Sequence, residues 1–127
     1  VIITRRINFL LFIFGQLSNE LLNLMIKHYV AQPRPIRSTR VGPGFPSSHA
    51  QFMAFASMYL LLTIINSSNI ERVIFSQRNK TISVRCQRII LIISAYLISI
   101  GVAYSRIALH LHSTIQVIAG FFIGSLF

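Results

Sequence analysis

The sequence is poor in acidic residues and in cysteine. Two of its 127 residues are acidic, and Cys86 is its only cysteine. One cysteine excludes an internal disulfide and a cysteine-based metal site. Two acids cannot make the carboxylate-rich sites that bind Ca²⁺ or Mg²⁺. Charged residues make up 11% of the chain, whereas soluble domains carry roughly 25%. The composition therefore argues against a soluble protein and offers no metal site.

The chain is rich instead in apolar sequence and positive charge. Hydrophobic residues make up 54% of it, and the net charge of +10 comes from twelve Lys and Arg. Mean hydropathy is +0.66. Such charge in a soluble protein would suggest nucleic acid, but here the basic residues lie between apolar runs and no nucleic-acid-binding motif occurs. We expect a membrane protein without a nucleic-acid partner. Because Val1 is not Met and Phe127 lies in an apolar run, we also expect a piece of a longer protein or a reduced form.

The apolar runs predict an all-α integral membrane helix bundle with four spans in a single domain, residues 1–127. The expected spans are 7–26, 48–66, 89–104 and 112–127. The polar segment 67–88 is expected to be a loop with a short amphipathic helix near residues 70–75. If each span crosses the bilayer, the 27–49 loop and the 105–112 turn meet at one face. The other face carries seven of the twelve Lys and Arg, which favours the cytoplasm for the 67–88 loop.

The stretch from residue 27 to residue 49 gathers positive charge just before a helix start. It holds Lys27, Arg34, Arg37, Arg40 and all four prolines. Ser47 and Ser48 follow, and either can cap the next helix. Cationic side chains and helix N-terminal amides both bind anions, so the stretch predicts a phosphate site. The alternative is a basic interfacial loop that only touches lipid headgroups.

Three short motifs occur in a familiar order. They are Lys27-x6-Arg34-Pro35, Pro46-Ser47-Ser48-His49 and Ser105-Arg106-x5-His112. Together they resemble the three-part signature of the lipid phosphate phosphatases, the type 2 phosphatidic acid phosphatase superfamily. Ser48 stands where glycine is usual and Gln116 where aspartate is usual. Both departures are similar to the dolichyl-diphosphatase branch, and the resemblance extends from Asn19 to Gly120.

The resemblance implies a phosphoryl-transfer site. His112 is expected to be the nucleophile that forms a phosphohistidine. His49 is expected to protonate the leaving oxygen and then to activate water. The residues expected to bind phosphate, through charge or backbone N–H groups, are Lys27, Arg34, Arg106, Ser47 and Ser48. With three cations in this role, neither a metal nor another cofactor is expected.

Two further residues are expected to support the histidine. Gln116 lies one helical turn after His112, so its carbonyl oxygen can orient the ring, although it carries no charge. Glu20 shares a helix face with Asn23 and Lys27. It is either a simple structural partner or a residue that positions a site cation, and we hypothesise that it supplies the missing negative charge.

Among the basic residues expected at the same face as the motifs, two histidines and two arginines are not part of them: His28, His110, Arg37 and Arg40. The two histidines are expected to be interfacial or packing residues. The two arginines are expected to attract a diphosphate or anionic headgroups.

The resemblance implies hydrolysis of dolichyl diphosphate to dolichyl phosphate and inorganic phosphate, which recycles the lipid carrier of protein N-glycosylation. The implied partners are a polyisoprenyl diphosphate lipid and the bilayer. The implied location is the endoplasmic reticulum membrane, with the site facing the lumen. Two alternatives remain open. One is a superfamily enzyme acting on phosphatidate, a sphingoid phosphate or undecaprenyl diphosphate, and the other is a catalytically inactive membrane scaffold.

Overall fold

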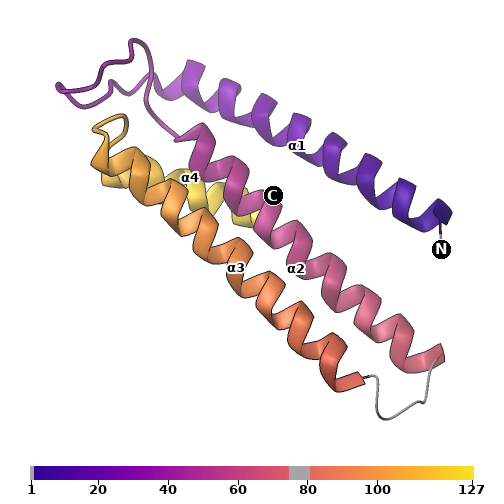
Figure 1. Cartoon of the computed structure of the whole chain (residues 1–127). Coiled ribbons are helices and arrows are strands. Elements are labelled where there is room, and N and C mark those ends of the chain that lie inside the picture. Colours follow the sequence, from indigo (N-terminus) through magenta and orange to yellow (C-terminus); the bar gives the residue numbers. More distant parts are fainter. Residues whose placement is uncertain (1, 75–80) are drawn as a thin grey trace.

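The computed structural model describes residues 2–74 and 81–127, with side chains placed for residues 6–66 and 84–127. The helices, in chain order, are α1 (Ile2–Val30), α2 (Ser48–Ile74), α3 (Thr81–Ala108) and α4 (Thr114–Leu126) (Figure 1). Segments long and apolar enough to cross a bilayer cover Arg6–Val30, Ser48–Asn66 and Val84–Ala108. The fourth helix is a 13-residue apolar helix. The prediction of an all-α membrane helix bundle is confirmed.

The polar segment between the second and third spans differs from expectation. Helix α2 continues to Ile74 and α3 begins at Thr81, so most of the predicted 67–88 loop is helical. Residues 70–74 are the last turn of α2 and not a separate helix, and residues 75–80 lie outside the described part of the chain. Neither flank contains Gly or Pro. Polar residues alone do not end a helix, because most of them cost only a fraction of a kcal/mol in its interior, roughly 0.7 at most.

Helix α2 is the centre of the bundle and packs against each of the other three helices. Its closest neighbour is α4, because two glycines of α4 let the backbones approach. A Cβ on Gly120 would lie 2.5 Å from the Ser47 carbonyl oxygen, and one on Gly124 would lie 2.1 Å from that of Gln51. In α2, Ala50 and Ala54 are fully buried, and Ala50 lies in a core cluster with Val117 of α4. Small residues four apart are the usual means of close helix packing in lipid.

The polarity of the bundle is inverted relative to a soluble protein. Large apolar side chains such as Phe14 and Leu97 are 70% and 63% exposed, while Asn23 and Gln51 are 0% and 1% exposed. In lipid the apolar exterior is solvated by acyl chains, whereas polar groups must find partners inside the protein. The polar chemistry of the chain is therefore concentrated in its interior and at one end.

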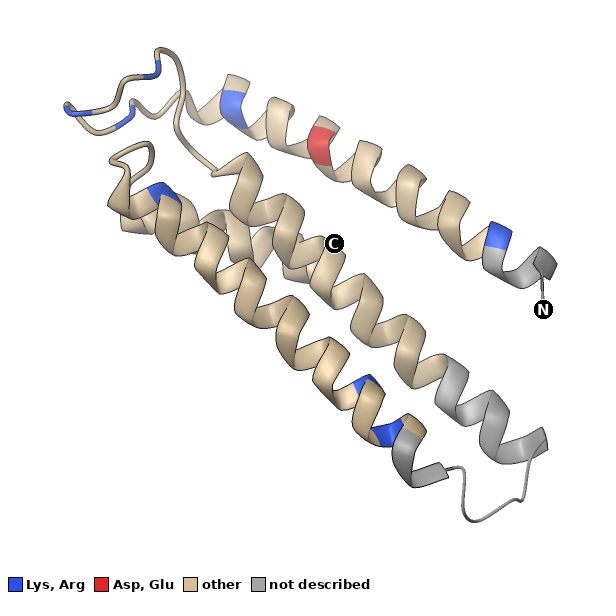
Figure 2. Cartoon of the chain, in the orientation of Figure 1, with Lys and Arg blue, Asp and Glu red and all other residues tan. Residues whose placement is uncertain are grey.

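The two polar segments predicted to meet do so. Both the 31–47 loop and the turn after α3 lie at the end of the bundle away from the N-terminus (Figure 1). Basic residues lie at this end, in the loop and near the ends of α1 and α3, and others lie at the opposite end of the bundle, while the acidic residue of α1 lies between the two basic residues drawn on that helix (Figure 2). Hydrogen bonds join the segments directly, from Arg34 to the Leu111 carbonyl and between Gly44 and His112.

Candidate active site

The turn after α3 delivers His112 into this end of the bundle. The Leu111 amide donates to the Arg106 carbonyl at 3.0 Å, and the His110 amide donates to the Ile107 carbonyl at 2.9 Å. His110 has a φ of 54°. These two bonds around a left-handed residue form a Schellman motif, which ends a helix sharply. His110 is thus a turn residue. The His112 amide also donates to the Arg106 carbonyl, at 3.2 Å.

His112 is held at both ring nitrogens and is only 5% exposed. Its Nδ1 lies 2.9 Å from the Gly44 carbonyl oxygen and its Nε2 lies 3.1 Å from Nη1 of Arg34. A carbonyl only accepts and a guanidinium only donates. The ring therefore carries its proton on Nδ1 and directs the Nε2 lone pair at Arg34. This is the tautomer that a nucleophilic Nε2 requires.

The surroundings of His112 also keep the ring neutral. Burial, and then the positive charge of Arg34, lower the pKa of His112 from 6.5 to about 4. Hydrogen bonding to the Gly44 carbonyl and to the Gln116 side chain raises the pKa, but by less, and the charge of Lys27 lowers it slightly further. Because the ring is unprotonated at neutral pH, its lone pair is available for attack.

Arg34 connects the loop to the turn. Its Nη1 donates to the Leu111 carbonyl at 2.9 Å as well as to His112. Burial, and then the neighbouring Arg40, lower the pKa of Arg34. The Arg34 Nε and the Ser47 Oγ are the buried side-chain polar atoms without a hydrogen-bond partner among the described residues. A guanidinium and a hydroxyl with donors to spare suit an anionic ligand.

Gln116 supports the loop on which Gly44 lies. Its Nε2 donates to the Pro33 carbonyl at 2.9 Å and to Gln32 Oε1 at 3.3 Å. Its Oε1 accepts from the Ser113 amide at 3.1 Å, in a capping box that starts α4. Its backbone carbonyl accepts from the Ser47 amide at 3.0 Å. Gln116 thus ties the start of α4 both to the loop and to the start of α2.

Gly44 is the residue of this site that the sequence motifs did not identify. Its amide donates to the Gln32 carbonyl at 2.8 Å, and its own carbonyl faces His112. A Cβ there would lie 2.6 Å from Gln116 Oε1 and 2.9 Å from Arg34 Cγ. Only glycine lets these groups meet. The available signal was a glycine between two prolines, Pro43 and Pro46, in a loop that joins two motifs.

The start of α2 brings the remaining motif residues to the same end. Ser47 is fully buried and precedes the first helical residue, Ser48. The Lys27 ammonium donates a hydrogen bond to the Ser48 hydroxyl. The exposed His49 lies in the first turn of α2, where backbone N–H groups have no partner within the helix.

The other residues named from the sequence lie around this centre. Arg106 lies in the last turn of α3, and its Nε donates to Ser105 Oγ at 3.2 Å. Glu20, Arg37, Arg40, His28 and His110 are exposed. No group of three His, Cys, Asp or Glu residues that could hold a metal ion occurs among the residues that the structure describes. The geometry thus assembles a neutral imidazole, nearby cations and a helix N-terminus, which is an arrangement suited to phosphoryl transfer.

Comparison with known proteins gives a consistent result. Residues 8–127 match the PAP2 superfamily. The dolichyldiphosphatase of Saccharomyces cerevisiae is 36% identical over 98% of this chain and 51% of its own length. Dolichyldiphosphatase 1 of Mus musculus is 34% identical over 99% of this chain and 52% of its length. The chloroplastic lipid phosphate phosphatase epsilon 1 of Arabidopsis thaliana is 31% identical over 91% of this chain and 36% of its length.

The chain therefore spans about half the length of the dolichyldiphosphatases it matches and about a third of the plant protein. No solved structure matches it.

Proposed function

The chain belongs to the PAP2 superfamily, and from that premise we propose that it forms the catalytic part of a membrane phosphatase that converts dolichyl diphosphate to dolichyl phosphate and inorganic phosphate. The observation that carries the proposal is the state of His112: a buried, neutral ring with its Nε2 lone pair directed at a cation. A phosphate group that takes the place of this contact would receive both a nucleophile and a positive charge. Residues 1–127 would act as one membrane-embedded domain.

In the first chemical step, Nε2 of His112 attacks the terminal phosphorus and the bond from that phosphorus to the bridging oxygen breaks. The leaving dolichyl phosphate takes the bond electrons and a proton from His49. The product on the enzyme is a phosphohistidine, whose Nδ1–H still faces the Gly44 carbonyl. That carbonyl fixes the ring orientation and stabilises the positive charge that develops on it.

In the second step, water attacks the phosphohistidine and releases inorganic phosphate. His49, which gave up its proton in the first step, now accepts one from the water. The phosphorus–nitrogen bond breaks and its electrons return to Nε2 as the lone pair. Lys27, Arg34 and Arg106 would neutralise the phosphoryl oxygens in both steps. Backbone amides at the start of α2, other than that of Ser47, which already donates to the Gln116 carbonyl, would donate to these oxygens.

The unpartnered buried donors support this role for the loop. Arg34 Nε and Ser47 Oγ lack partners within the described part of the chain, and burying such groups unsatisfied costs about 1–3 kcal/mol each. Their cost is understandable if both donate to a phosphate during catalysis. Gln116 would keep them in place, because its backbone bonds Ser47 and its side chain lies against the loop.

The substrate and location are proposed from the relatives. Relatives matched over 98% and 99% of this chain are named dolichyldiphosphatases, which favours a polyisoprenyl diphosphate. We place the protein in the endoplasmic reticulum membrane by the same resemblance, and the excess of Lys and Arg at the other face favours the lumen for the site. The relative named lipid phosphate phosphatase epsilon 1 favours a second candidate, a phosphatidate-type substrate at the same site.

The test is phosphate release by the purified protein in detergent with EDTA present. Wild type should release phosphate from dolichyl diphosphate and His112→Ala should not. Hydrolysis of phosphatidate but not of dolichyl diphosphate would exclude the first substrate and support the second candidate, a phosphatidate-type substrate. Equal release by wild type and His112→Ala would exclude His112 as the nucleophile. If wild type hydrolyses neither lipid, the remaining alternative is a catalytically inactive membrane scaffold.

A further inference from the structure

A continuous chain of hydrogen bonds runs from Lys27 into the interface between α1 and α2. Each group donates to the next, always in the same direction: Lys27 Nζ to Ser48 Oγ, Ser48 Oγ to Asn23 Oδ1 (2.9 Å), Asn23 Nδ2 to Gln51 Oε1 (2.6 Å), Gln51 Nε2 to Asn19 Oδ1 (2.7 Å), Asn19 Nδ2 to Gln16 Oε1 (3.4 Å) and Gln16 Nε2 to the Phe52 carbonyl (3.2 Å). We call this set the amide chain.

The amide chain is buried in a bundle whose exterior is apolar. The four amide side chains are Gln16, Asn19, Asn23 and Gln51, exposed by 8%, 2%, 0% and 1%. Buried amides are tolerated only when their polar atoms are paired, and here the pairing is complete from one end to the other. Such a network is more elaborate than helix packing requires, because α4 packs on the same α2 with glycines and alanines.

We propose that Asn23 and Gln51 are positioning residues that hold the Ser48 hydroxyl, and through it the Lys27 ammonium, in place for the substrate phosphate. The inference rests on the proposed phosphatase function and adds residues that lie outside the three sequence motifs. Asn23 is the central member, since it accepts from Ser48, donates to Gln51 and also donates to the Pro46 carbonyl at 3.5 Å. It thereby joins α1 to the first turn of α2.

The chemistry of an amide suits this task better than that of a carboxylate. A carboxylate next to Lys27 would fix the ammonium but would also compensate its charge, and less would remain for the phosphate. A hydroxyl backed by an amide oxygen fixes the ammonium and leaves its charge intact. Because every acceptor in the amide chain faces toward Lys27, the aligned bonds also strengthen one another.

The same contacts explain Ser48, which stands where the resembled signature has glycine. Its hydroxyl is the link that accepts from Lys27 and donates to Asn23. A glycine at this position would end the amide chain one step short of the ammonium.

The test uses the purified protein and two measurements. Calorimetry gives the affinity for inorganic phosphate, and steady-state kinetics give kcat and KM for dolichyl diphosphate. We expect Asn23→Ala to weaken phosphate binding and to raise KM by about tenfold, equivalent to roughly 1.4 kcal/mol, with a smaller effect on kcat. We expect the isosteric Asn23→Asp to weaken phosphate binding and to raise KM as well, because its carboxylate would compensate the charge on Lys27.

The matched control is Ser57→Ala. Ser57 Oγ lies 2.6 Å from Ser99 Oγ between α2 and α3, so this variant removes a buried hydrogen bond that has no connection to Lys27. It should lower thermal stability without changing phosphate affinity. Asn23→Asp keeps the side-chain volume, so it still tests the proposal if Asn23→Ala does not fold.

The outcomes separate this inference from the proposed function. Wild-type affinity and KM in both Asn23 variants, or an equal loss of affinity in Ser57→Ala, would overturn the positioning role. A wild type that binds phosphate but hydrolyses no lipid diphosphate would end the proposed function, while the affinities of the variants would still decide the positioning role. A wild type that binds no phosphate would overturn both.

Discussion

Arg34 Nη1 lies 3.1 Å from His112 Nε2, so the cation occupies the approach to the nitrogen that we propose as the nucleophile. The contact keeps the lone pair directed toward a positive group and discourages its protonation. A substrate phosphate must take over this guanidinium before His112 can reach phosphorus. Binding of the substrate phosphate to Arg34 would then also end the contact between Arg34 and His112 and make the nucleophile available.

Removal of the guanidinium in Arg34→Gln should lower kcat/KM by about a hundredfold, which is typical for loss of a group that stabilises developing charge. It should also raise the pKa of His112 above about 4, because burial and then the charge of Arg34 lower this pKa, and the variant removes the second cause. The measurements are phosphate release and an NMR titration of the histidine. Arg37→Gln, an equal charge change at an exposed position of the same loop, is the control. An unchanged pKa of His112 in Arg34→Gln would contradict the electrostatic coupling.

The protonation of His112 should make the stability of the protein depend on pH. His112 has a pKa of about 4 in the folded protein against 6.5 when unperturbed, so between these values the unfolded chain binds a proton that the folded chain does not. Stability from this source is fully present above pH 6.5 and is lost as pH falls toward 4, by up to about 1.4 kcal/mol per pH unit. Thermal unfolding in detergent across this range should show the fall. His112→Gln should show a flatter profile, and an equally steep one would assign the effect to another group.

Gly124→Ala should destabilise the bundle. The added Cβ would lie 2.1 Å from the Gln51 carbonyl oxygen, so α4 must move away from α2, at a cost of roughly 1–3 kcal/mol. Gly101→Ala is the matched control, since no atom lies within 4 Å of a Cβ there and alanine favours a helix interior by about 1 kcal/mol. Melting temperatures should therefore move in opposite directions. A rise in both would contradict the close approach of α4 to α2.

The left-handed turn at His110 predicts that glycine is tolerated at this position. His110→Gly should retain activity or improve stability, because the residue has a φ of 54° and glycine adopts that conformation without strain. His110→Val should cost about 1–2 kcal/mol and should misplace His112, two residues later. The measurements are melting temperature and phosphate release. Loss of activity in His110→Gly with unchanged stability would instead give the imidazole a chemical role.

The helices and the meeting of the polar segments could be predicted from sequence, because both depend on hydropathy and on the number of crossings. The spans at 7–26, 48–66 and 89–104 correspond to the described helices. The predicted helix ends around residues 67–88 were wrong. A polar sequence was interpreted as a break between helices, whereas neither Gly nor Pro interrupts that sequence.

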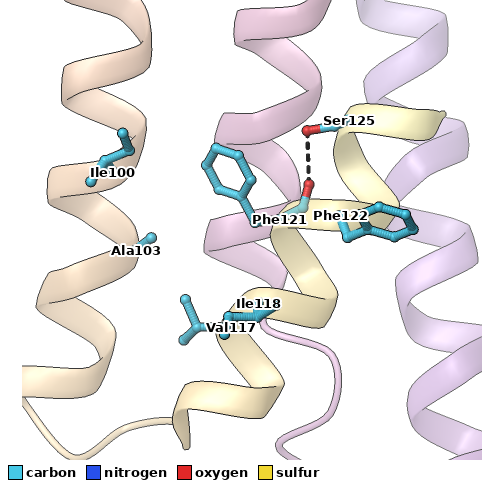
Figure 3. A pocket seen from close by; sticks show the side chains of 7 residues that line it. All are labelled: Ile100, Ala103, Val117, Ile118, Phe121, Phe122 and Ser125. Atoms are coloured by element: carbon cyan, nitrogen blue, oxygen red, sulfur yellow. Dashed lines mark hydrogen bonds between the residues drawn. The ribbon is translucent and has the colours of Figure 1, made fainter.

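The partners of the site residues could not be predicted in the same way. The acceptor for His112 is a backbone carbonyl, that of Gly44, and any residue type has one. Asn23 and Gln51 are 28 positions apart and meet through the rotation of two helices about their axes. The sequence placed Asn23 on a face with Glu20 and Lys27, but it gave no sign of the partner on α2. The apolar groove between α3 and α4, lined by Ala103, Val117 and Phe121 among others (Figure 3), was likewise not predicted.

The close packing of α4 on α2 has a consequence for how this protein can vary. Gly120 lies against Ser47, a proposed phosphate ligand, and Gly124 lies against Gln51, a member of the amide chain. The same positions therefore determine both the stability of the bundle and the rate of catalysis, so a substitution selected for one property also changes the other. Variants gaining heat resistance without altered catalysis should arise on lipid-facing helix surfaces, such as that around Gly101, and seldom in the interior.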